Sequence, residues 1–324
     1  MDVTTSSVVR EQLVERRDKL QAAISATQER HDLLHLLSEV DAALTRLDVG
    51  QYGRCEVCQD QIETDRLLAD PLVRVCLDHL SRDEQRSLEE DLELASRIQR
   101  GLLPEPRQHI DGWEIAYHYQ PARVVSGDYC DVIPADGGFY FMLGDVSGKG
   151  VSASMLMAHL HAMFRTLASL NLPLPALMER ASRAFCESTL PTHYATLVAG
   201  HATASGDVEV CNAGHLPIVI TSERGPTLMA STALPVGMFC SERFKADRLR
   251  LAAGETMVLV SDGVTESENP LGHEFGFDRF AAAAQRHRAR QPGDLIAECR
   301  RDLAAFTGGS RPADDITLFA VRRT

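Results

Sequence analysis

The stretch LGDVSGKGVSAS, residues 143–154, places glycines, a lysine and serines between an apolar run and an apolar helical segment. A P-loop would need Ser or Thr directly after its Gly-Lys pair, because that hydroxyl holds the magnesium ion. Here Gly150 follows Lys149, and the preceding glycines are one residue too close together. The spacing argues against a nucleotide-binding loop. It leaves Asp145, shortly after the run FYFML and before a flexible turn, as a candidate metal ligand at a strand end.

Three further stretches place carboxylates beside apolar strands. They are SGDYCD with Asp128 and Asp131, SDGVTE with Asp262 and Glu266, and ADDIT with Asp314 and Asp315. Any one of them alone has a simple structural explanation, because Asp-Gly is usually a turn and Asp-Asp is usually solvated. Together with Asp145 they favour a cluster of hard oxygen ligands. Such a cluster suits Mg²⁺ or Mn²⁺ rather than Zn²⁺.

The bulk composition is that of a globular protein. The chain has 324 residues, 44% of them hydrophobic, which suggests two or three domains. Its net charge of -13 argues against nucleic acid as a direct partner. No apolar run approaches the roughly 20 residues that span a membrane, and the N-terminus does not resemble a signal peptide. We therefore expect a cytoplasmic protein with its eight cysteines reduced, where clustered cysteines indicate metal binding.

Residues 1–49 are expected to form a helical or coiled-coil segment. Two apolar stripes lie within residues 6–48, one with Leu13 and Leu20 and one with Leu37 and Leu44. The stripes are out of phase, with Thr27 and His31 between them. This pattern fits either a short helical hairpin or a shifted coiled coil, and the sequence leaves both open.

Residues 50–80 are turn-rich and carry two metal-ligand pairs. Cys55-x-x-Cys58 and Cys76-x-x-His79 are separated by 17 residues, a spacing typical of four ligands around one tetrahedral zinc ion. The alternative is that Cys76 is a small core residue and His79 a solvated one. Because all four positions would be filled by protein, the predicted site is structural rather than catalytic.

Residues 81–103 are predicted to form a single linker helix. Ser81 and Glu84 fit a capping box at its start, and Pro104 ends it. An apolar stripe follows the helix at Leu88, Leu92, Ala95, Ile98 and Leu102. Such a stripe requires a packing partner, either the chain's own larger domain or the same helix of a second copy in a homodimer.

Residues 104–324 are expected to form an α+β domain with helices packed on antiparallel sheets. The predicted strands lie in WEIAYHY, GFYFMLGDV, YATLVAGHATA, GDVEVCNAGHLPIVIT, RLRLAAGETMVLVSDGV and DDITLFAVRR. The predicted helices cover residues 151–170, 175–189, 277–289 and 293–306.

The smaller module resembles a known zinc finger. Residues 36–80, with ALTRLDVGQYGRCEVCQDQI and RVCLDHL, look like the finger half of the DksA/TraR family. That family enters the secondary channel of RNA polymerase, so the resemblance implies polymerase as a partner. The acidic tip motif of the family is not evident here, which argues against that partner.

The larger domain resembles the SpoIIE-type bacterial branch of the metal-dependent protein phosphatases (PPM). Six motifs over residues 104–322 carry the resemblance, in order: GDYCD, GDVSGKGVSASMLMA, CNAGHLP, LPVGMF, LVSDGVTES and ADDITLFAV. It implies a sandwich of two antiparallel sheets flanked by helices, with two Mn²⁺ or Mg²⁺ ions at one edge. The implied metal ligands are Asp128, Asp145, the Val146 carbonyl, Asp262, Asp314 and Asp315.

The same resemblance implies a function. Asp145 and Asp262 would be the central catalytic carboxylates, and Arg123 and Lys149 could contact the substrate phosphate. The expected activity is protein serine/threonine phosphatase, acting on a phosphorylated anti-sigma-factor antagonist. The alternative is a polymerase- or partner-binding regulator whose phosphatase domain is inactive. No general acid is assigned, since Ser147 and Gly148 stand where eukaryotic relatives carry a histidine.

Overall fold

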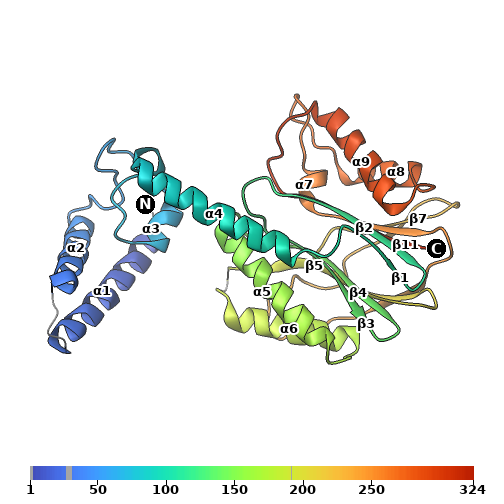
Figure 1. Ribbon diagram of the computed structural model, residues 1–324, viewed down its shortest axis with the longest axis horizontal. Coiled ribbons are helices and arrows are strands. Elements are labelled where there is room, and N and C mark those ends of the chain that lie inside the picture. The colour runs from blue at the N-terminus through green and yellow to red at the C-terminus, as the bar shows by residue number, and fades with distance from the viewer. Residues whose placement is uncertain (1–2, 27–30, 191) are drawn as a thin grey trace. The chain divides into compact units, whose positions relative to one another are not determined.

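A computed structural model describes residues 3–26, 31–190 and 192–324 of the chain (Figure 1). The chain divides into two compact units, Met1–Asp91 and Leu92–Thr324, and each is described by itself. None of the described helices combines the length and apolar character needed to cross a bilayer.

The N-terminal unit is built around a helical hairpin. Its helices are α1 (Val3–Ala26) and α2 (His31–Asp48), and Leu13 and Leu20 of the first share one core with Val40 of the second. Of the two interpretations of residues 6–48, the structure therefore confirms the helical hairpin over the shifted coiled coil. Thr27, where the sequence indicated a break, lies outside the described residues.

The finger segment packs on the same hairpin. It contains α3 (Thr64–Ala69) and the 3-10 helix η1 (Leu77–His79). Tyr52, Ile62 and Leu67 are buried in the core that the two long helices form, and the Tyr52 hydroxyl donates to the Pro71 carbonyl at 2.7 Å. The finger therefore depends on the hairpin, and the hairpin on the finger, for part of its apolar contacts.

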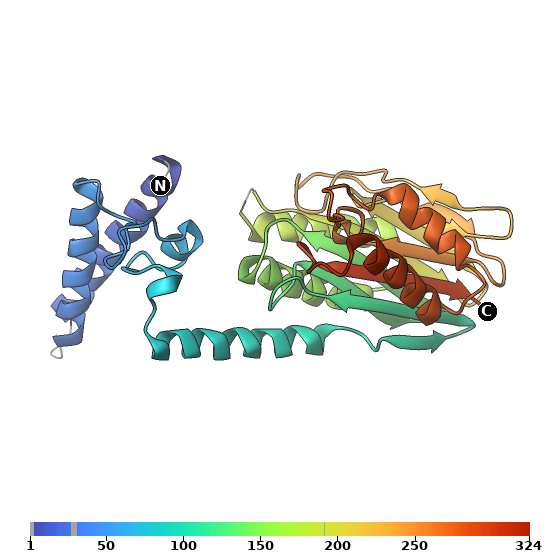
Figure 2. The ribbon, with the colours of Figure 1, turned by 90° about the horizontal axis from the view of Figure 1, so that it is seen from above.

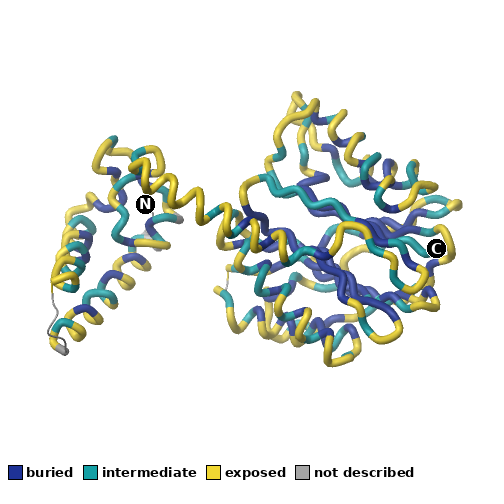
Figure 3. Tube along the Cα trace, viewed as in Figure 1, coloured by how far each residue is buried: buried dark blue, intermediate teal, exposed yellow. Residues whose placement is uncertain are grey.

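Helix α4 (Arg82–Leu102) begins and ends where the sequence predicts. The Ser81 Oγ accepts from the Glu84 amide at 3.2 Å, and the Glu84 carboxylate accepts from the Ser81 amide at 2.8 Å, so the capping box is confirmed. The apolar stripe is covered only in part by this chain: Leu102 packs on the core of the C-terminal unit, whereas Leu88 and Ile98 are 41% and 60% exposed. Figure 3 shows α4 as largely exposed, and its buried residues are Ser96 and Gln99.

The C-terminal unit contains two antiparallel sheets. One has the strand order β1-β2-β11-β10-β7-β8 and the other β3-β4-β5-β6-β9. The strands of the first sheet are β1 (Arg107–Ile110), β2 (Trp113–Gln120), β7 (Ile218–Thr221), β8 (Thr227–Met229), β10 (Thr256–Val260) and β11 (Ile316–Arg323). Those of the second are β3 (Asp128–Ala135), β4 (Gly138–Val146), β5 (Ala195–Thr203), β6 (Asp207–Ala213) and β9 (Asp247–Arg250).

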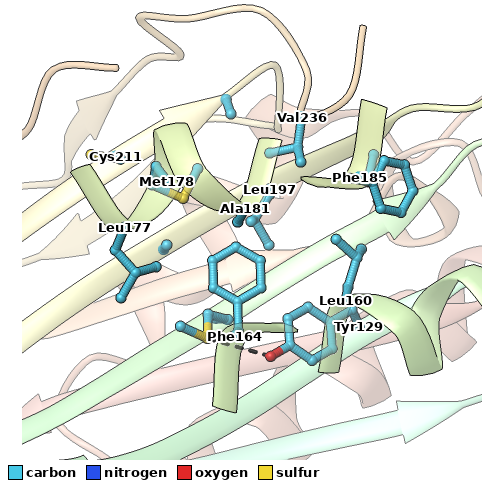
Figure 4. Packing of buried hydrophobic residues seen from close by; sticks show 14 of the residues in the cluster. Tyr129, Leu160, Phe164, Leu177, Met178, Ala181, Phe185, Leu197, Cys211 and Val236 are labelled. Carbon is cyan, nitrogen blue, oxygen red and sulfur yellow. Dashed lines mark hydrogen bonds between the residues drawn. The ribbon is translucent and has the colours of Figure 1, made fainter. Parts of the chain in front are cut away.

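Helices cover the outer face of each sheet, and the two inner faces pack on each other (Figures 1 and 2). The helices are α5 (Val151–Ala168), α6 (Leu174–Ser188), α7 (Asp262–Thr265), α8 (Phe277–Arg286) and α9 (Pro292–Thr307). Phe139, Phe141 and Phe319 lie in the core between the sheets. Figure 4 shows the core beneath α5 and α6, where Phe164 and Met178 face strand residues such as Leu197. The predicted α-β-β-α sandwich is confirmed.

Strand β3, like the short strands β1 and β8, is absent from the predicted strands. Its residues Asp128, Asp131 and Pro134 are poor strand formers, and they interrupt the apolar pattern. The strand forms because partners elsewhere satisfy the two carboxylates: Thr317 donates to Asp128, and Arg165 to Asp131. Tertiary contacts override local propensity here.

The expectation that all eight cysteines are reduced is wrong for one pair. Cys186, at the end of α6, forms a disulfide with Cys240 in the loop before β9, and their Cα atoms lie 5.4 Å apart. The two residues are 54 positions apart, so no spacing motif announces the pair. Packing of this loop on α6 brings the thiols together, as the Gly237 amide also donates to the Ser182 hydroxyl at 3.1 Å.

Candidate functional site

Four strand ends that carry aspartates meet at one edge of the sandwich. Asp128 opens β3 and lies directly opposite Asp145 in the β3–β4 register. Asp145 shares the face of β4 that Phe139 and Phe141 turn toward the other sheet, because side chains alternate along a strand. Across the sandwich, Asp262 follows β10 and Asp314 precedes β11. The fold thus brings together four of the carboxylates that the sequence singled out.

Asp131 does not join this cluster. It lies three residues after Asp128 and therefore on the opposite face of β3, toward α5. Its carboxylate is fully buried, and Arg165 donates to its two oxygens at 2.8 and 3.0 Å. Asp131 serves to hold α5 on the sheet.

Burial and mutual repulsion make the clustered carboxylates hard to ionise. Burial first, and then the charges of Asp262 and Asp314, raise the pKa of Asp145 to about 7. Burial and the neighbouring Asp145 raise the pKa of Asp128 well above its ordinary value. Burial and Asp314 raise the pKa of Asp262. Such a set of oxygen donors fits divalent cations, which would offset the repulsion.

Asp315 is engaged differently from Asp314. Both of its carboxylate oxygens accept main-chain N–H groups, from Ala122 at 2.7 Å and from Gly127 at 2.9 Å. It thereby fixes the loop that leads into Asp128. The turn at Asp314–Asp315 lies so close to α7 that a Cβ on Gly263 would come within 2.1 Å of the Asp315 carbonyl oxygen. A side chain at Gly263 would therefore push α7, which carries Asp262, away from the Asp314–Asp315 turn.

Two cations lie beside the cluster. The Lys149 Nζ donates to Asp314 at 2.6 Å, and this bond raises the pKa of Lys149. Arg123 is exposed, and its charge opposes ionisation of Lys149. The Val146 amide donates to the Gly127 carbonyl at 3.3 Å, so Val146, whose carbonyl the sequence predicts as a ligand, is anchored to the same loop.

A cleft of about 610 Å³ opens beside these residues. Its walls come from the ends of α7 and α9 and from residues 309–314, and they include Lys149 and Asp314. Arg300 and Arg311 line the cleft together with Glu266 and Glu274, so its walls carry charges of both signs.

His215 of the NAGH turn joins the two sheets, while the side chain of Asn212 bonds within the turn, to the His215 amide and the Leu216 carbonyl. The buried His215 ring lies 2.9 Å from the Thr196 hydroxyl by Nδ1 and 3.0 Å from the Val260 carbonyl by Nε2. A carbonyl only accepts, so Nε2 carries the proton and Nδ1 accepts from Thr196. Thr196 pairs with Asp145 in the sheet, and Val260 precedes the turn to Asp262.

The ring of His215 should make stability depend on pH. Burial lowers the pKa of His215 to about 4, from an ordinary value of 6.5. As the pH falls below 6.5, the unfolded chain therefore binds a proton at His215 while the folded protein does not. The contribution of neutral His215 to the free energy of unfolding is complete above pH 6.5, and up to about 3 kcal/mol of it is lost between pH 6.5 and pH 4. Urea unfolding at several pH values should show a shallower pH dependence for His215→Gln; equal slopes for both proteins would contradict this.

The four predicted zinc ligands lie together in the N-terminal unit. Ligand atoms of Cys55, Cys58, Cys76 and His79 all fall within 4.8 Å of one another, the one such group found among the described residues. Zn–S bonds of about 2.3 Å place two thiolates of a tetrahedral site about 3.8 Å apart. The sulfurs of Cys58 and Cys76 are 3.8 Å apart. Although burial opposes it, backbone N–H groups of the turns lower the pKa of Cys55 to about 6, which favours the metal-binding thiolate.

Comparison with protein families finds two matches. Residues 50–78 match the prokaryotic dksA/traR C4-type zinc finger, and residues 135–324 match stage II sporulation protein E (SpoIIE). His79 is one residue beyond the first match, where a histidine supplies the fourth candidate ligand in place of a cysteine.

Two curated proteins are similar over most of this chain. Protein IcfG of Synechocystis sp. is 27% identical over 263 residues, which cover 72% of this chain and 41% of that protein. The phosphoserine phosphatase RsbU of Bacillus subtilis is 23% identical over 245 residues, covering 75% of this chain and 72% of that protein. The chain thus spans less than half the length of the first relative.

Solved structures share the fold. The SiaA-PP2C domain of Pseudomonas aeruginosa aligns with a TM-score of 0.65 at 19% identity, covering 74% of this chain and 98% of that domain. The phosphatase domain and regulatory fragment of SpoIIE from Bacillus subtilis align with a TM-score of 0.57 at 15% identity, covering 67% and 64%. The SpoIIE match alone covers more than half of the chain. The chain therefore belongs to the SpoIIE family of metal-dependent protein phosphatases and carries an N-terminal dksA/traR-type zinc finger.

Proposed function

We propose that this chain is a metal-dependent protein serine/threonine phosphatase. The observation that carries the proposal is the convergence of Asp128, Asp145, Asp262 and Asp314 at one sandwich edge, with the pKa of Asp145 raised to about 7. These four carboxylates, with the Val146 carbonyl, would hold two Mn²⁺ or Mg²⁺ ions. When bound, the ions would lower the pKa of a shared water and offset charge on the phosphoryl oxygens.

The chain's own residues orient the substrate. Lys149, now on Asp314, lies within reach of the cluster and would bind a phosphoryl oxygen, with Arg123 adding positive charge. The adjoining cleft of about 610 Å³ would receive the polypeptide that carries the phosphorylated residue. The ester is cleaved by water to alcohol and phosphate, without a covalent bond to the enzyme.

The substrate class follows from the relatives. RsbU is a phosphoserine phosphatase, and by analogy we propose that the substrate here is a regulatory phosphoprotein, an anti-sigma-factor antagonist. Because ATP-dependent kinases produce such substrates inside the cell, we place the activity in the cytoplasm.

The test uses the full chain treated with chelator and then titrated with Mn²⁺ or Mg²⁺. Hydrolysis of p-nitrophenyl phosphate and of a phosphoserine protein should both appear only with added metal. Metal binding without any turnover would instead favour the alternative, a partner-binding regulator with an inactive phosphatase domain.

We also propose that α4 pairs with α4 of a second chain. Ser96 and Gln99 face the helix's own domain, whereas Leu94 and Ile98 are 48% and 60% exposed. Covering a large apolar side chain contributes about 1.5–3 kcal/mol. Sedimentation of the full chain should therefore show a dimer, and Ile98→Glu should convert it to a monomer, whereas Arg100→Glu on the same helix should not. A monomeric full chain would contradict this pairing.

A further inference from the structure

Helix α4 buries two polar side chains, Ser96 and Gln99. Gln99 is 6% exposed, in a helix where neighbouring Arg97, Ile98 and Arg100 are exposed. Its amide makes two hydrogen bonds to the main chain of a single residue. The Nε2 donates to the Ser126 carbonyl at 2.7 Å, and the Oε1 accepts from the Ser126 amide at 3.0 Å. A buried amide satisfied on both sides fixes the position of its partner.

Ser126 belongs to the loop that enters the aspartate cluster. The Ser126 hydroxyl accepts from the Asp128 amide at 3.0 Å, and the next residue, Gly127, donates to Asp315 at 2.9 Å. The Asp315 amide in turn donates to Asp314 at 2.9 Å. One short chain of contacts therefore runs from Gln99 to the carboxylates on both sheets.

Loss of the Gln99 amide would leave both main-chain groups of Ser126 without these partners. Ser126 is 1% exposed, so water cannot replace the bonds without opening the loop. The aspartates at the end of this loop repel one another, and the hydrogen bonds of the loop help to hold them together against that repulsion. Loss of the bonds to Ser126 should therefore weaken cation binding, beyond any loss of overall stability.

We propose that Gln99 is a positioning residue, which couples the end of α4 to the metal-binding loop by holding Ser126 at both main-chain groups. Because α4 also contributes to the N-terminal unit, a displacement of this helix would reach the aspartates through one amide. The inference rests on the metal centre of the proposed function.

The decisive measurement is the Mn²⁺ dissociation constant of the chelator-treated full chain, by titration calorimetry. Gln99→Met keeps the shape of the side chain and removes both bonds, and we expect about tenfold weaker Mn²⁺ binding. Gln99→Glu keeps an acceptor for the Ser126 amide but loses the donor, and it should also bind Mn²⁺ more weakly; it carries the test if Gln99→Met does not fold. Hydrogen exchange at residues 122–128 should accelerate in both variants.

The matched control is Gln85→Met, which removes a glutamine from the exposed first half of the same helix. The Gln85 side chain donates to the Leu80 carbonyl at 3.2 Å, far along the helix from Ser126, so Mn²⁺ affinity should equal that of the unchanged chain. A Gln99 variant that loses stability but binds Mn²⁺ as tightly as the unchanged chain would overturn the inference. If the unchanged chain itself bound no Mn²⁺, the proposed metal centre would fail first, which separates the two results.

Discussion

Asp145→Asn is expected to abolish metal-dependent phosphatase activity while making the metal-free protein more stable. The change removes a carboxylate from the cluster that would hold the metals, so turnover should fall by more than about 10³-fold, equivalent to about 4 kcal/mol of activation free energy. In the metal-free protein the ionised Asp145 carboxylate lowers the free energy of unfolding. Its pKa of about 7 lies roughly 3 units above the ordinary value of 3.8, because of burial and the repulsion from Asp262 and Asp314.

The sign of the stability change follows from that pKa. Ionised Asp145 disfavours folding above pH 4, and fully so above pH 7, at about 1.4 kcal/mol per pKa unit. With chelator at pH 8, urea unfolding of Asp145→Asn should therefore show a gain on the order of 2–4 kcal/mol. With Mn²⁺ present the gain should vanish, since the unchanged protein then gains binding free energy that the variant lacks.

Asp136→Asn is the matched control for this substitution. Asp136 is exposed in the turn that joins β3 and β4, at the far end of the two strands that carry Asp128 and Asp145. Its replacement should change neither turnover nor metal-free stability. An Asp145→Asn variant that folds and keeps full turnover would refute the two-metal assignment.

Replacing Cys55 and Cys58 by serine is expected to remove one zinc ion per chain and to unfold residues 50–80. Structural zinc contributes about 10–16 kcal/mol of apparent binding free energy at neutral pH in isolated fingers, far more than a segment this small gains by packing. Because Tyr52 and Ile62 share a core with the α1–α2 hairpin, the hairpin should also lose protection against hydrogen exchange.

The control for the zinc prediction is the double change Cys186→Ser and Cys240→Ser. It also removes two cysteines, but these form a disulfide in the C-terminal unit. Elemental analysis should still find one zinc ion per chain in that variant. One zinc ion retained by the Cys55→Ser, Cys58→Ser protein would show that these thiols are not ligands.

The sequence by itself determined the parts that depend on neighbouring residues. The two Cys/His pairs each lie within one turn, so spacing alone predicted the grouping that the structure shows for Cys55, Cys58, Cys76 and His79. The Ser81–Glu84 capping box is likewise local. Asp145 lies near the end of β4 and Asp262 lies two residues after β10, each beside a glycine. Such a strand end is visible in the order of residues, so both could be predicted as candidate ligands from the sequence.

Only the tertiary structure decided which of these groups face one another. Asp128 and Asp131 occupy one short motif, yet strand alternation and the distant Arg165 send them to opposite faces of β3. The apolar stripe of α4 did not show which face of the helix is buried, since a polar contact, from Gln99 to a residue 27 positions away, helps to orient it. Gly127 and Asp315 are 188 positions apart. Contacts at such separations depend on how the two sheets pack, and no local pattern of residue types records them.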